Sequence, residues 1–85
     1  MSGKMVDMKN ITIYSTPTCT YCHAAKDFLK EKGVAFTDYN VATDLARRKE
    51  MVEKSGQMGV PVIDVDGTIM VGFDKVELAQ AVGIK

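Results

Sequence analysis

The two cysteines of this 85-residue chain stand close together, in Cys19-Thr20-Tyr21-Cys22. A bridge between them closes so short a loop that it cannot staple a fold as the disulfides of small secreted domains do. The chain must therefore bury a hydrophobic core of its own, and 46% hydrophobic against 26% charged residues suits a globular domain. We expect one domain over residues 10–85, preceded by a poorly ordered lead-in over residues 1–9.

The cysteine motif lies between a predicted strand and a predicted helix. Residues 10–14 are rich in β-branched side chains and alternate apolar positions, and residues 15–18 are turn formers. After the motif, apolar residues recur at helical spacing as far as Gly33, which is the expected stop. The pattern thus predicts that Cys19 lies at the N-terminus of a helix.

This placement predicts different roles for the two sulfurs. Unpaired backbone N–H groups and the positive end of the helix dipole stabilise a thiolate at Cys19, so Cys19 is the expected nucleophile. Cys22 lies one turn into the helix and should be better shielded. It is the expected resolving cysteine, which attacks a mixed disulfide rather than an incoming substrate.

The second half of the chain alternates in the same way. Residues 34–41, 60–65 and 69–71 are predicted strands, and Asp66-Gly67 is a hairpin turn between the last two. The resulting order, β-α-β-α-β-β-α, predicts an α/β fold in which three helices flank a four-stranded mixed sheet.

Two further helices complete this order. The first begins at Thr43-Asp44 and ends at Ser55-Gly56; the second begins at Asp74, with Glu77 as the partner in a capping box. The residues that we expect to face the core are Phe28, Leu29, Phe36, Leu45, Met51, Val52, Leu78, Ala81 and Val82.

Charge and hydropathy limit the partners. Eleven basic and eleven acidic residues balance, which gives no reason to expect nucleic acid or an anionic membrane as a partner. The sequence contains no secretory signal pattern and no apolar run of about 18 residues. We therefore expect a cytoplasmic protein, and we also expect it to be a monomer. In that reducing compartment a Cys-x-x-Cys pair is more often catalytic or metal-binding than structural.

Several segments together resemble the glutaredoxins, a family with the thioredoxin fold, over about residues 10 to 82. The resemblance implies a dithiol–disulfide oxidoreductase that reduces protein disulfides or glutathione mixed disulfides through Cys19 and Cys22. The segments that carry it, in the family's order and spacing, are Tyr14-Ser15, Cys19-Thr20-Tyr21-Cys22, Asn40-Val41, Ser55-Gly56-Gln57, Gly59-Val60-Pro61 and Gly72-Phe73-Asp74.

The same resemblance implies the surroundings of the dithiol. Pro61 is expected to be a cis-proline facing the sulfurs, and Val60 to pair through its backbone with an extended substrate chain. The remaining residues implied in substrate or glutathione binding are Tyr21, Gln57, Phe73 and Asp74. Glutathione is thus a candidate co-substrate, and no bound cofactor or metal is expected.

The electron donor is left open by two opposing sets of residues. Glutathione-using glutaredoxins carry basic residues at the positions of Thr16 and Met58, which are uncharged here. Gly72-Phe73, and Cys22-His23-Ala24 followed by Lys26, look like the NrdH-type redoxins, which thioredoxin reductase recharges. Tyr21 and Gln57, however, match the glutathione-using branch. Both glutathione and thioredoxin reductase are therefore candidate donors.

The motif allows three other interpretations. Some glutaredoxins bind an iron–sulfur cluster between two chains, and a role as a cluster-binding carrier is the alternative function. Cys-x-x-Cys-His also matches a covalent haem attachment pattern, with His23 as the ligand, but an export signal is missing. A structural zinc site would need a second pair of cysteines.

Overall fold

A computed structural model describes residues 10–83, so the predicted lead-in over residues 1–9 lies outside the described residues. The order of helices and strands is the predicted one, although the second and third strands are shorter than expected because residues 34–36, 41 and 60–61 lie outside them. The elements are β1 (Ile11–Ser15), α1 (Thr20–Glu31), β2 (Thr37–Asn40), α2 (Leu45–Ser55), β3 (Val62–Val65), β4 (Thr68–Val71) and α3 (Lys75–Val82).

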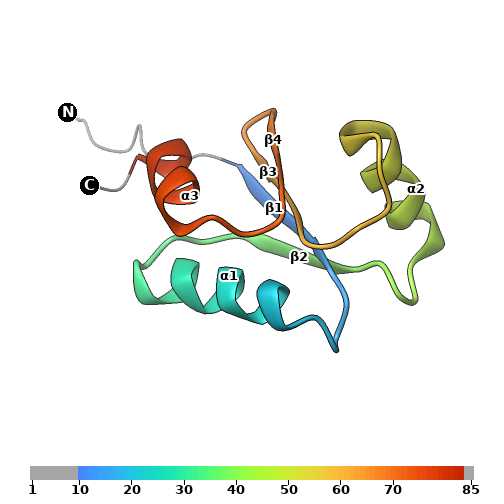
Figure 1. The fold of residues 1–85 in the computed structure, drawn as a ribbon, viewed down its shortest axis with the longest axis horizontal. Helices are drawn as coiled ribbons and strands as arrows, with labels where there is room; N and C mark the ends of the chain where they lie inside the picture. Colours follow the sequence, from blue (N-terminus) through green and yellow to red (C-terminus); the bar gives the residue numbers. More distant parts are fainter. Residues whose placement is uncertain (1–9, 84–85) are drawn as a thin grey trace.

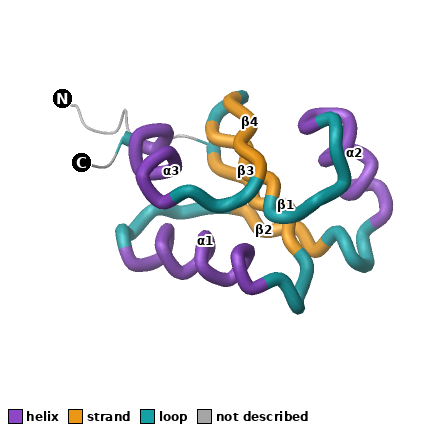
Figure 2. The backbone as a smooth tube through the Cα atoms, viewed as in Figure 1, coloured by secondary structure: helices purple, strands orange, loops and turns teal. Residues whose placement is uncertain are grey.

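The four strands form one mixed sheet in the order β2-β1-β3-β4. The β1 strand pairs parallel with β2 and antiparallel with β3, and β3 pairs antiparallel with β4. Figures 1 and 2 show α1 and α3 on one face of this sheet and α2 on the other. The predicted α/β architecture is confirmed. Among residues 10–83, no helix is long and apolar enough to cross a bilayer.

The main core lies between the sheet and the pair α1 and α3. Alternate residues of β1 and β3 face it, as the two-residue period of a strand requires, and Ile13 and Ile63 are fully buried there. Phe28 and Leu29 are buried as predicted, while Phe36 is only partly buried at the edge of the cluster. This core fixes α1, and with it the cysteine motif, against the sheet.

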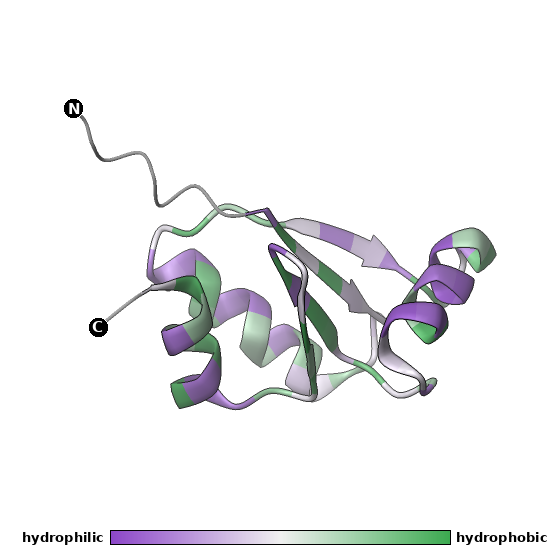
Figure 3. Ribbon diagram, turned by 90° about the horizontal axis from the view of Figure 1, so that it is seen from above, coloured by the Kyte–Doolittle hydropathy of each residue, from purple (hydrophilic) through white to green (hydrophobic). Residues whose placement is uncertain are grey.

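The α2 face has a smaller core, built around Tyr14, Met51 and Val62. Val52 packs against this cluster, but the prediction that Leu45 faces inward is wrong, because its side chain is 70% exposed. Leu45 is the first residue of α2, and Figure 1 shows that this first turn lies farther from the strands than the rest of the helix. The helix is mostly hydrophilic in Figure 3, so its few apolar residues in the second half make the contact with the sheet.

The predicted helix starts and the hairpin turn are present. Asp44 and Asp74 each accept a hydrogen bond at 3.1 Å from the backbone N–H three residues ahead, which satisfies one unpaired donor in the first turn of α2 and of α3. Between β3 and β4, Asp66 and Gly67 both have positive φ, at 53° and 99°, as a two-residue hairpin turn requires.

Candidate active site

Cys19 is the N-cap residue of α1. Its backbone is extended, with φ −84° and ψ 112°, and its Sγ accepts a hydrogen bond from the backbone N–H of Cys22 at 3.1 Å. The carbonyl of Cys19 already accepts the first helical bond, from His23 N–H at 3.1 Å. The sulfur thus occupies the place that a serine or aspartate oxygen takes at other helix starts, where an anion is stabilised by unpaired N–H groups.

Cys22 differs from Cys19 in exposure and in acidity. Cys19 is partly exposed, whereas Cys22 is fully buried, and both are free thiols. Burial, together with the hydrogen bond to Cys19, raises the pKa of the Cys22 thiol to about 12. The backbone of Thr16 and the charge of Lys26 act in the opposite direction and lower this pKa. Because Cys22 is buried and Cys19 is not, only the sulfur of Cys19 is accessible to a large substrate.

The loop between α2 and β3 carries the predicted cis-proline. The Val60–Pro61 peptide bond is cis, Pro61 is buried, and the Pro61 carbonyl accepts a hydrogen bond from Gly72 N–H at 2.8 Å. Within residues 10–83, neither the backbone N–H nor the C=O of Val60 has a partner. Both groups are thus available to pair with an extended chain, as expected from the sequence.

Two views place this loop near the dithiol. In Figures 1 and 3 the α2–β3 loop and the β4–α3 loop both lie beside the N-terminal end of α1. The bond between Pro61 and Gly72 joins these two loops. The predicted site segments are thus gathered at one end of α1, although they come from three separate parts of the chain.

The other predicted site residues differ in how far they are exposed and in whether they also contact the rest of the fold. Tyr21 is 66% exposed beside the two cysteines. Phe73 is partly buried and packs against Phe28, with ring centroids 6.0 Å apart. The carboxylate of Asp74 is the N-cap of α3. Tyr21 is therefore free to meet a partner, whereas Phe73 and Asp74 also have structural roles.

Gln57 is hydrogen-bonded within its own loop. Its Oε1 accepts from Gly59 N–H at 2.8 Å, and its Nε2 donates to the Gly59 carbonyl at 3.0 Å. Ser55 Oγ also donates to the Gln57 carbonyl at 2.9 Å. The side chain thus shapes the approach to Val60, and a ligand that used the Gln57 amide would compete with these bonds.

A polar cluster beside the dithiol was not predicted from the sequence. Ser15 Oγ donates to Asp38 Oδ1 at 2.7 Å, and Lys26 Nζ donates to Asp38 Oδ2 at 2.9 Å. Ser15 is buried at the end of β1, and Lys26 lies on α1 one turn after Cys22. The spacing of Cys22 and Lys26, four residues on one helix, is the sequence signal that points to the lysine.

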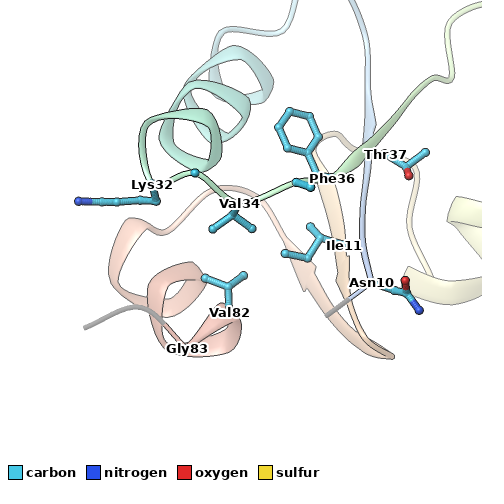
Figure 4. A pocket seen from close by; sticks show the side chains of 10 residues that line it. Asn10, Ile11, Lys32, Val34, Phe36, Thr37, Val82 and Gly83 are labelled. Carbon is cyan, nitrogen blue, oxygen red and sulfur yellow. The ribbon is translucent and has the colours of Figure 1, made fainter. Parts of the chain in front are cut away.

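A large surface pocket is remote from the cysteines. It has a volume of about 620 Å³ and lies between the C-terminal end of α1, the start of β1 and the end of α3 (Figure 4). A smaller pocket of about 440 Å³ lies between α1 and the segment that leads into α3, next to Phe73. The residues that line the larger pocket are Asn10, Ile11, Lys32, Gly33, Val34, Ala35, Phe36, Thr37, Val82 and Gly83.

The mixed sheet, the helices on both of its faces and a Cys-x-x-Cys pair at the start of the first helix define a thioredoxin-fold dithiol protein. Solved structures agree with this assignment. A mutant form of the thioredoxin-like protein BC3987 superposes with a TM-score of 0.85 at 32% identity, covering 92% of this chain and 100% of the other.

Within that class, the chain belongs to the glutaredoxin family, because the family model named Glutaredoxin matches residues 11–70. It is 51% identical, over 85% of its length and 96% of the relative's, to an uncharacterized glutaredoxin-like 8.6 kDa protein in the rubredoxin operon of Clostridium pasteurianum. It is 40% identical to glutaredoxin 3 of Escherichia coli K12, over 89% and 92% of the two chains. The glutaredoxin-like protein NrdH of Lactococcus lactis is 36% identical, over 82% and 96%. The protein is therefore a glutaredoxin-like redox protein.

Proposed function

We propose that this protein is a dithiol–disulfide oxidoreductase in which Cys19 attacks the substrate disulfide and Cys22 resolves the mixed disulfide. The observation that carries the proposal is the contrast between the two thiols. Cys19 is partly exposed at a helix N-terminus and accepts a backbone hydrogen bond at 3.1 Å, whereas Cys22 is buried. An accessible nucleophile and a shielded second thiol suit a two-step exchange.

The reaction balances through two exchange steps. The Cys19 thiolate attacks one sulfur of the substrate disulfide, which forms a mixed disulfide and releases the other sulfur as a thiolate. The Cys22 thiolate then attacks Cys19 Sγ, and the substrate's second sulfur leaves. Two electrons pass to the substrate, each departing thiolate takes a proton from water, and the protein is left with a Cys19–Cys22 disulfide for a donor to reduce.

Substrates of this site are proposed to be disulfides carried on extended protein segments, with glutathione mixed disulfides as a second group. The unpaired backbone of Val60 supports this, because it can add two hydrogen bonds to an extended chain of any sequence. The exposed Tyr21 offers apolar area beside the sulfurs. Pro61, Phe73 and Asp74 are proposed to border the same surface.

For the donor we propose a protein of the thioredoxin reductase type rather than glutathione. Basic side chains bind the carboxylates of glutathione most strongly, and Thr16 and Met58 supply no positive charge. The amide of Gln57 is already bonded to Gly59. The likeness to a protein named NrdH is consistent with this choice. We further propose that the protein works as a cytoplasmic monomer without a bound cofactor. No observation on residues 10–83 favours the cluster-binding alternative.

The test measures NADPH consumption with a disulfide substrate in two arms. One arm contains glutathione and glutathione reductase, and the other contains the thioredoxin reductase of the same cell. We expect turnover mainly in the second arm, and loss of turnover in both arms for Cys19→Ser. Turnover confined to the glutathione arm overturns the donor proposal, while full activity of Cys19→Ser overturns the oxidoreductase proposal.

A charge-restoring variant makes the donor test sharper. Thr16→Lys with Met58→Arg supplies the two missing positive charges and should raise turnover in the glutathione arm by about ten-fold. The matched control, Thr68→Lys with Gln80→Lys, also adds two positive charges, at exposed positions of β4 and α3, and should leave that arm unchanged. An equal rise in the control would mean that net charge alone attracts glutathione.

A further inference from the structure

Three side chains from three elements meet behind the dithiol. Lys26 Nζ lies 2.9 Å from Asp38 Oδ2 and 3.4 Å from Ser15 Oγ, and Ser15 Oγ lies 2.7 Å from Asp38 Oδ1. The side chain of Lys26 is only 16% exposed. An ordinary surface lysine extends its ammonium into water. The ammonium of Lys26 is instead held in place by two acceptors, Asp38 and Ser15.

The register of the sheet explains why this cluster faces the dithiol helix. Ile13 of β1 points into the core beneath α1, and Asp38 is its partner across the parallel ladder. Side chains paired in register lie on the same face, so Asp38 faces α1 as Ile13 does. Ser15 follows two residues after Ile13 and therefore shares this face. Cys22 and Lys26, four residues apart, are on the face of α1 that meets them.

Cys22 has few charged neighbours on this side. The groups that act on its acidity are the thiol of Cys19, the backbone of Thr16 and the ammonium of Lys26, and Lys26 lowers the pKa that burial raises. The charge of Lys26 is itself offset by Asp38 from β2. His23 points elsewhere, since it is exposed and its Nε2 bonds to the Pro17 carbonyl at 2.7 Å.

We propose that Lys26 is a positioning residue for the resolving step, in which its ammonium, held by Asp38 and Ser15, stabilises the buried thiolate of Cys22. This inference rests on the proposed function, because it concerns the second of the two exchange steps. Cys22 must lose its proton to water before it can attack Cys19 Sγ. A fixed positive charge near the thiol favours the ionised form, and Asp38 moderates that charge.

The two steps can be timed separately with a chromogenic aromatic disulfide in a stopped-flow instrument. Attack by Cys19 releases the first coloured thiol at a rate that depends on reagent concentration. Attack by Cys22 releases the second at a rate that does not. Lys26→Gln should slow the second release about three- to ten-fold at neutral pH and move its pH profile upward. The first release should change little.

Removal of Asp38 gives a prediction of opposite sign. Asp38→Asn leaves the ammonium of Lys26 uncompensated, so the second release should become about three- to ten-fold faster and its pH profile should move downward. If the ion pair merely held the fold, the two variants would break it equally and change the rate in the same direction. Opposite shifts therefore separate an electrostatic role from a structural one.

Two further variants complete the test. Lys26→Arg keeps the charge and should keep the rate of the second release, which also covers the case in which Lys26→Gln does not fold. Lys30→Gln removes an exposed lysine from the same helix and is the matched control. An unchanged second release in Lys26→Gln, or slowing in both Lys26→Gln and Asp38→Asn, overturns the proposal. Failure of the first release in the wild-type protein would instead overturn the proposed function.

Discussion

The buried thiol of Cys22 offers a direct test of the asymmetry between the two cysteines. Its pKa is raised from 9.0 to about 12, so its thiolate fraction at neutral pH is about a thousand-fold lower than that of an unperturbed thiol. Alkylating reagents attack the thiolate. Cys22 should therefore react far more slowly than an ordinary cysteine, even with a small reagent such as iodoacetamide.

The measurement uses the Cys19→Ser variant, in which Cys22 is the remaining cysteine. The serine hydroxyl keeps an acceptor at the start of α1. Two of the effects that raise the pKa of Cys22 come from Cys19 itself, but the largest is burial and is retained. We therefore expect alkylation to be about a hundred- to a thousand-fold slower than in the same variant unfolded by guanidinium.

The dependence on pH distinguishes acidity from simple blockage by neighbouring atoms. If the thiol is protonated, the rate should rise about ten-fold per pH unit and continue to rise beyond about pH 10. Mass spectrometry of timed samples gives the rate. A rate that levels off near about pH 9, as in the unfolded variant, would refute the reasoning, because burial would then not hold the proton.

Three further predictions concern stability. Because the pKa of Cys22 is higher in the folded than in the unfolded chain, its stabilising effect is complete below about pH 9 and is lost as pH rises toward about 12. Guanidinium unfolding of Cys19→Ser should therefore show a steeper alkaline decline than the double variant with Cys22→Ala, in which the raised pKa values of Tyr14 and Lys54 still act. Tyr14→Phe removes part-buried hydrogen bonds to Glu50 and from Lys54, and should lower the free energy of unfolding by about 1–2 kcal/mol. An unchanged urea midpoint would contradict this prediction. Asp44→Ala removes the side chain that caps α2 and should lower the free energy of unfolding by about 1 kcal/mol. Asp44→Asn should lower it by less, and neither variant should alter the rate of thiol exchange.

The order of elements and the helix starts were predictable because they depend on neighbours in the chain. Asp44 and Asp74 cap helices through N–H groups three residues away, and Asp66-Gly67 turns within a single hairpin. The position of Cys19 at the start of α1 follows from the same kind of local signal. In each case the partner atoms lie within a few residues, so the sequence pattern contains the whole interaction.

Contacts between distant segments were less predictable. Leu45 fits the apolar face of α2 by its spacing, but spacing does not tell where the sheet ends, and its side chain is 70% exposed. The bonding of Gln57 to Gly59 depends on the exact path of a loop. The pairing of Lys26 with Asp38 requires α1 to pack over β2, which no local pattern specifies.

The sequence by itself determined the elements, the family resemblance and the two cysteines that carry the chemistry, because hydrogen bonds in helices and turns and the periods of apolar residues are local. The tertiary structure alone decided how those cysteines differ. Burial beneath the packed helix and sheet raises the pKa of Cys22, and the register of β1 with β2 brings Asp38 to Lys26. Solvent exclusion and charge pairing both depend on segments that are far apart in the chain, so they exist only once it has folded.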